Sequence, residues 1–150
     1  MIGVGDKAPE FTAPGTGGVD YSLGDYCGRA VILVFYPGDN TPVCTRQLNA
    51  YSEGVDDFSE FDAQLLAISP QSVASHEDFS CRQGGFGFPL LADEDKAIAQ
   101  AYGVLGPLGF YRRCVFVIDP EGVVRYSHRA LAGLTFKPTA ELVAAVRSAS

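Results

Sequence analysis

Residues 30–44 are AVILVFYPGDNTPVC, and this stretch decides the fold because an apolar run leads directly into turn and helix-start residues. The run 30–36 is apolar on both faces, as expected of a central strand covered by helices. Thr41 is predicted to cap a helix by accepting a backbone N–H, and Pro42 suits the first helical position. Cys44 follows in the first turn, where free N–H groups and the helix dipole favour a thiolate. The stretch therefore predicts a strand, a loop and a helix that carries an activated thiol.

Outward from this stretch, strands and helices alternate along the chain. The first 28 residues are loop-rich, with a short hairpin expected from 11–13 and 19–22. Further extended segments are expected at 64–69, 89–93, 114–119 and 123–127, and helices at 42–53, 72–83, 95–102 and 138–148. The order indicates one mixed α/β domain over residues 1–150.

Composition excludes several classes of protein. The net charge of −7 argues against a nucleic-acid-binding surface, which needs clustered Lys and Arg. No signal peptide and no apolar run of membrane-spanning length is apparent. The four cysteines have neither CxxC nor zinc-like spacing, and two histidines make a metal site improbable. We therefore expect a soluble cytoplasmic protein, without nucleic-acid or membrane partners, whose disulfides would be transient and catalytic.

Pro37, Thr41 and Cys44 form a Pro-x-x-x-Thr-x-x-Cys pattern that resembles the active-site signature of peroxiredoxins. Asp39-Asn40 and Pro42 make it most similar to the PrxQ, or bacterioferritin-comigratory-protein, subgroup. The resemblance extends over nearly the whole chain, through GDKAPEFT, SVASHEDF, FGFPLLAD and RCVFVID. It implies a thioredoxin-like fold with an extra N-terminal hairpin, and a thiol-dependent peroxidase without metal or organic cofactor. Hydrogen peroxide and organic hydroperoxides would be the substrates.

The resemblance also implies what the residues around the signature do. Cys44 would attack one peroxide oxygen and become a sulfenic acid. Thr41 would hydrogen-bond the peroxide, and Pro37 would shield the sulfur from water. The backbone N–H groups of Val43 and Cys44 would complete the oxygen-binding site.

An arginine on the buried side of the thiol is the second source of activation that the resemblance implies. Arg113, just before the strand at 114–119, would direct its guanidinium at the thiolate and the peroxide. Arg112 is its neighbour, so in an extended chain the two side chains face opposite ways and only one can reach the site. Gln47, one turn beyond Cys44, occupies a position where the family often has a polar residue that buttresses the arginine.

One position departs from the commonest PrxQ pattern. Asn49 stands where many such proteins have a second cysteine, five residues after the first. Cys81 lies where other members have their resolving cysteine, so the resemblance implies an intramolecular Cys44–Cys81 disulfide. Two such helix positions should lie farther apart than the roughly 7 Å over which Cα atoms can be bridged. Both helices would have to unwind locally, which Gly84-Gly85 should ease.

Several alternatives stay open at this point. Thioredoxin or a similar dithiol would recycle the disulfide, but an external small thiol could instead leave Cys81 a bystander. A thioredoxin-fold redox sensor that hardly turns over is a third hypothesis. The subgroup is often monomeric, and a dimer stays open. Cys27 and Cys114 are expected to be structural, and His76 a surface or helix-capping residue.

Overall fold

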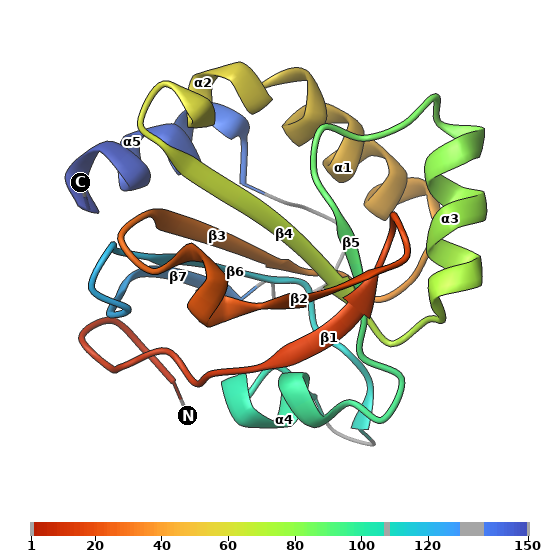
Figure 1. The fold of residues 1–150 in the computed structure, drawn as a ribbon, viewed down its shortest axis with the longest axis horizontal. Coiled ribbons are helices and arrows are strands. Elements are labelled where there is room, and N and C mark those ends of the chain that lie inside the picture. The colour runs from red at the N-terminus through yellow and green to blue at the C-terminus, as the bar shows by residue number, and fades with distance from the viewer. Residues whose placement is uncertain (1, 107–108, 130–136, 150) are drawn as a thin grey trace.

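The computed structural model describes residues 2–106, 109–129 and 137–149, and one mixed β-sheet organises them (Figure 1). Within these ranges the sheet has seven strands: β1 (Thr12–Gly15), β2 (Val19–Ser22), β3 (Ala30–Phe35), β4 (Ala63–Ser69), β5 (Leu90–Ala92), β6 (Cys114–Ile118) and β7 (Val124–Arg129). Their order across the sheet is β2-β1-β5-β4-β3-β6-β7. β3, β4 and β5 are parallel neighbours, whereas β1, β2, β6 and β7 pair antiparallel. The predicted mixed α/β architecture with an N-terminal hairpin is confirmed.

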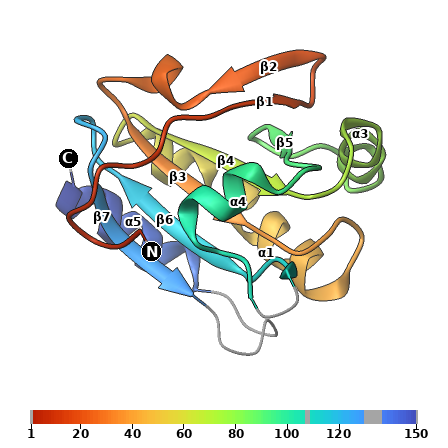
Figure 2. The ribbon, with the colours of Figure 1, turned by 90° about the horizontal axis from the view of Figure 1, so that it is seen from below.

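Helices cover both faces of the sheet. They are the 3₁₀ helix η1 (Leu23–Tyr26) and the α-helices α1 (Pro42–Glu53), α2 (Val55–Ser59), α3 (Val73–Arg82), α4 (Ala97–Tyr102) and α5 (Thr139–Ala149). Figures 1 and 2 show α1, α2 and α5 on one side of the sheet and α4 on the other. Helix α1 begins and ends where predicted. The short η1 and α2 were not predicted, because segments of four and five residues are too short to show a helical period.

Strand β3 is the centre of the core, and all six of its residues are buried. Successive side chains point to opposite faces. Ile32 and Val34 pack with residues of α1, α2 and α5, while Leu33 and Phe35 pack with residues of α4. The predicted strand that is apolar on both faces is therefore confirmed.

The topology gathers several chain segments at one edge of the sheet. Because β3, β4 and β5 run parallel, their carboxyl ends lie at the same edge. The loop from β3 to α1 leaves from this edge, and β6 begins there because Phe35 pairs with Cys114. The signature loop and Arg113 thus meet although they are far apart in sequence. Among the described helices, none is both long and apolar enough to cross a bilayer.

Truncating the central strand should destabilise the whole fold. Leu33 is fully buried, so Leu33→Ala is expected to lower the free energy of unfolding by about 2–5 kcal/mol. Val19→Ala is the control, because Val19 is 53% exposed and its loss should cost under about 0.5 kcal/mol. Urea unfolding followed by circular dichroism measures both, since the chain has no tryptophan. Equal effects of the two variants would contradict the central placement of β3.

Candidate active site

Cys44 lies in the first turn of α1 and is fully buried. Thr41 is the N-cap residue by its backbone, with φ −85° and ψ 148°, and Pro42 opens the helix as predicted. The expected side-chain cap was wrong: the Thr41 hydroxyl instead donates to the Gly38 carbonyl oxygen at 3.1 Å. A short hydroxyl side chain can turn back to a nearby carbonyl, and here it does. The first-turn N–H groups beside Cys44 are therefore not capped by Thr41.

Arg113 is the predicted cation beside the Cys44 thiol, and the structure places it there. Its Nη2 donates to Cys44 Sγ at 3.2 Å, and its Nη1 donates to Gln47 Oε1 at 2.5 Å. Arg113 is only 4% exposed and Gln47 is fully buried. The structure thus brings together three of the predicted site residues. The guanidinium is thus held beside the sulfur by hydrogen bonds to two acceptors.

The hydrogen bonds continue from Gln47 to a residue that sequence reasoning missed. Gln47 Nε2 donates to the Tyr51 hydroxyl at 3.4 Å, and that hydroxyl donates to the Lys137 carbonyl oxygen at 2.7 Å. Burial raises the pKa of Tyr51 to about 12, against smaller lowering effects of Gln47 and Arg113, so the phenol keeps its proton. The signal in the sequence was the spacing: Tyr51 follows Gln47 by one helical turn.

The remaining predicted site residues lie on the loop and the helix start. Pro37 and Thr41 are exposed, and Val43 is half-buried. All three lie on the segment that leads from β3 into α1 and are therefore close to Cys44 in sequence. Their roles toward a peroxide remain predictions.

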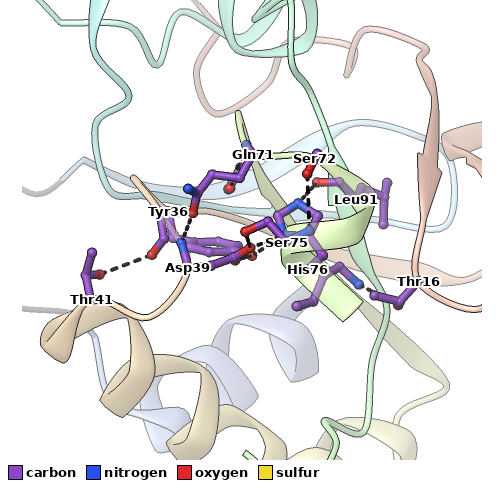
Figure 3. Close-up of polar contacts among 12 residues, drawn as sticks. Thr16, Tyr36, Asp39, Thr41, Gln71, Ser72, Ser75, His76 and Leu91 are labelled. Carbon is purple, nitrogen blue, oxygen red and sulfur yellow. Dashed lines mark hydrogen bonds and ion pairs between the residues drawn. The ribbon is translucent and has the colours of Figure 1, made fainter. Parts of the chain in front are cut away.

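His76 is not the surface or capping residue that the sequence suggested. It is fully buried, and its Nδ1 donates to Asp39 Oδ2 at 2.7 Å (Figure 3). The hydroxyl groups of Tyr36 and Ser75 donate to the same carboxylate, each at 2.7 Å. Burial opposes ionisation of Asp39, but the hydrogen bonds from His76, Tyr36 and Ser75 outweigh it and lower the pKa of the carboxyl. A buried polar network therefore adjoins the signature loop.

Cys81 lies in the last turn of α3, and its residue is exposed. All four cysteines are free thiols in this structure, so the Cys44–Cys81 disulfide remains a prediction. Just beyond Cys81, Gly84 and Gly85 have φ values of 80° and 92°, which favour glycine. Asn49 Nδ2 donates to Gln83 Oε1 at 2.9 Å, which joins α1 to the end of α3.

The two other cysteines differ in burial. Cys114 is fully buried in β6, and burial raises the pKa of its thiol to about 11. This fits the predicted structural role. Cys27 is exposed at the end of η1, so core packing does not account for it. No group of three or more His, Cys, Asp or Glu side chains in the described ranges is arranged to hold a metal ion.

The sequence also matches a known protein family and several known proteins. The model of the AhpC/TSA family matches residues 4–127. The chain belongs to this family. A putative peroxiredoxin in the rubredoxin operon of Clostridium pasteurianum is 38% identical over 136 residues, covering 83% of this chain and 76% of that protein.

Solved structures of bacterial proteins share the fold. The bacterioferritin comigratory protein of Xanthomonas campestris, studied for its alkyl peroxide reduction activity, is 30% identical with a TM-score of 0.82, covering 92% of this chain and 90% of that one. The peroxidoxin BcpB of Mycobacterium tuberculosis is 27% identical with a TM-score of 0.87, covering 100% and 99%. The thioredoxin-like peroxiredoxin fold and the PrxQ resemblance are confirmed.

Burial should make Cys114 nearly inert in the native protein. With a pKa of about 11, only about one thiol in a thousand is ionised at pH 8. Iodoacetamide labelling followed by peptide mass spectrometry should modify exposed Cys27 more than tenfold faster. The Cys114 rate should rise about tenfold per pH unit between pH 7 and 9, because its thiolate fraction does. Equal labelling of the two residues would contradict this assignment.

Proposed function

We propose that this chain is a thiol-dependent peroxidase that reduces hydrogen peroxide and organic hydroperoxides at Cys44. The observation that carries the proposal is the buried guanidinium of Arg113, which donates to Cys44 Sγ at 3.2 Å beside the start of α1. The alkyl peroxide reduction activity named for the Xanthomonas relative supports organic hydroperoxides as one substrate class. At the ordinary pKa of a cysteine only about 3% would be thiolate at pH 7, so activation of this kind is needed.

In the chemical step the Cys44 thiolate attacks one oxygen of the peroxide, and the O–O bond breaks. The sulfur becomes a sulfenic acid, and the other oxygen leaves with the electron pair and takes a proton to form water or an alcohol. Arg113 stabilises the negative charge that develops on oxygen, because its donors are fixed in direction. The backbone N–H groups of Val43 and Cys44 would add to this stabilisation.

Three further residues have supporting roles in the proposal. The Thr41 hydroxyl proton is engaged by the Gly38 carbonyl, so its oxygen would accept a hydrogen bond from the peroxide. Gln47 would hold the Arg113 guanidinium in place through its 2.5 Å contact. Pro37 would limit access of water to the sulfur.

Cys81 is the proposed resolving residue. Its thiolate would attack the sulfenic sulfur of Cys44, forming the S–S bond and releasing the hydroxyl group as water. Since Cys44 is buried in α1 and Cys81 is exposed on α3, this step requires local unwinding of both helices. Thioredoxin or a similar dithiol would then reduce the disulfide. If the two helices instead stay wound, Cys81 does not reach Cys44, and an external thiol would have to reduce the sulfenic acid.

Counting thiols after one equivalent of hydrogen peroxide tests the two cysteine roles. We expect the wild type to lose two thiols and to yield a linked 44–81 peptide, and Cys44→Ser to lose none. Cys81→Ser should stop at a Cys44 sulfenic acid that a small thiol can reduce. Oxidation of Cys44→Ser at the wild-type rate would refute the proposed peroxidatic role, and a missing 44–81 peptide would favour external resolution. Fast NADPH oxidation in a thioredoxin-coupled assay would exclude the sensor hypothesis.

The neighbouring arginines provide a matched pair of variants. Arg113→Lys keeps the charge but loses the forked donors that reach both Cys44 and Gln47, so the rate of Cys44 oxidation should fall about a hundredfold. Arg112→Lys should remain within about twofold of the wild type. Stopped reactions analysed by mass spectrometry give both rates. Similar losses in both variants would refute a specific role of Arg113.

A further inference from the structure

The structure contains a second buried polar contact, separate from that of Arg113. His76 is fully buried and Asp39 is 7% exposed. His76 Nδ1 lies 2.7 Å from Asp39 Oδ2, and His76 Nε2 lies 2.9 Å from the Leu91 carbonyl oxygen. The imidazole therefore bridges the Asp39 carboxyl group and the Leu91 carbonyl oxygen. This buried contact ties the signature loop to α3 and β5.

The groups that face this pair all support the charged carboxylate. Tyr36 donates to Asp39 Oδ1 and Ser75 to Asp39 Oδ2, so three side chains donate to one carboxylate (Figure 3). The Tyr36 oxygen also lies 3.3 Å from His76 Nδ1. Burial and the charge of Asp39 raise the pKa of Tyr36 well above its usual value, so it stays a donor. Such a fully satisfied buried network holds its members in one arrangement.

This network fixes the backbone of the loop as well as a side chain. The Asp39 N–H donates to Gln71 Oε1, so the residue is held through both its amide and its carboxylate. The next residue, Asn40, has a φ of 62°, in the left-handed region that asparagine tolerates better than most residues with a Cβ. Asp39 lies two residues after Pro37 and two before Thr41. Anchoring Asp39 therefore sets where the two proposed peroxide-side residues stand.

We propose that Asp39 and His76 are positioning residues, which hold the loop from Pro37 to Thr41 in the geometry that peroxide reduction at Cys44 requires. This inference rests on the proposed peroxidase function. His76 contacts none of the reacting atoms and acts through Asp39. A loop held in this way lets the donors and acceptors for the peroxide be in place before it binds.

Two reactions of the same sulfur distinguish positioning from simple structural support. Oxidation by hydrogen peroxide needs the oriented loop, whereas alkylation by iodoacetamide needs only an accessible thiolate. In His76→Leu the rate of Cys44 oxidation should fall about tenfold or more, while Cys44 alkylation should be unchanged or faster. The apparent KM for peroxide should rise with the loss in rate. His76→Asn, which can keep a donor toward Asp39, should recover part of the oxidation rate.

Asp39→Asn tests the other side of the pair, and Asp119→Asn is its matched control. Asp119 is 6% exposed, similar to Asp39, and pairs with Arg125 at 2.7 Å. It follows β6 directly, at the end of that strand away from Arg113. Asp39→Asn should lower the oxidation rate as His76→Leu does. Asp119→Asn should leave it within about twofold even where it lowers the melting temperature.

A milder variant covers the case in which removal of a buried charge prevents folding. Tyr36→Phe keeps the buried ring and removes one donor to Asp39, so oxidation should slow about two- to tenfold. Oxidation at the wild-type rate in the folded variants would overturn the positioning role and leave the peroxidase proposal intact. Parallel losses in oxidation and alkylation would also overturn it. Failure of the wild-type Cys44 to react with peroxide would instead overturn the proposed function, and the inference with it.

Discussion

The contact between Arg113 and Cys44 is the interaction on which the rest of the site depends. A guanidinium stays charged at every physiological pH, and this one is 4% exposed. Burial of a charge is costly unless acceptors surround it, and Gln47 and the sulfur lie within reach of its donors. The contact that gives the buried cation an acceptor therefore also places it at the sulfur that we propose reacts with peroxide.

Two buried polar contacts flank the signature segment. Arg113, just before β6, reaches Cys44 on the helix side, and His76 of α3 holds Asp39 on the loop side. The segment between Asp39 and Cys44 includes Asn40, whose left-handed backbone turns the chain toward the start of α1. Contacts from α3 and from the residue before β6, both far away in sequence, thus hold the segment 39–44 at its two ends. The parallel strands make this arrangement available, because their carboxyl ends deliver those elements to one edge of the sheet.

Local patterns in the sequence predicted the elements of this edge, and non-local contacts account for what was missed. The apolar run and the Thr-Pro helix start located β3 and α1. Strand alternation allowed only one of Arg112 and Arg113 at the site, and the family resemblance pointed to Arg113. His76 gave no such signal, because its burial depends on a partner far away in sequence. Thr41 was predicted correctly as a cap residue but not in its hydrogen bond, since the choice between two nearby backbone partners is decided by the loop's geometry. The roles of Pro37 and Cys81 rest on the family resemblance alone.

The contacts that favour the first proposed step oppose the second. Under the proposed mechanism, peroxide reduction would use the wound α1, in which Cys44 Sγ and Arg113 meet. The proposed disulfide with Cys81 would need the same turn to open, and the Asn49–Gln83 hydrogen bond at 2.9 Å, which joins α1 to the end of α3, would resist that opening. Gly84 and Gly85, with a left-handed backbone, end α3 just beyond Cys81, so only the last turn of α3 would have to open. Under the proposed mechanism, the balance of these local terms sets how long the sulfenic acid survives, and hence how much a second peroxide can oxidise it further.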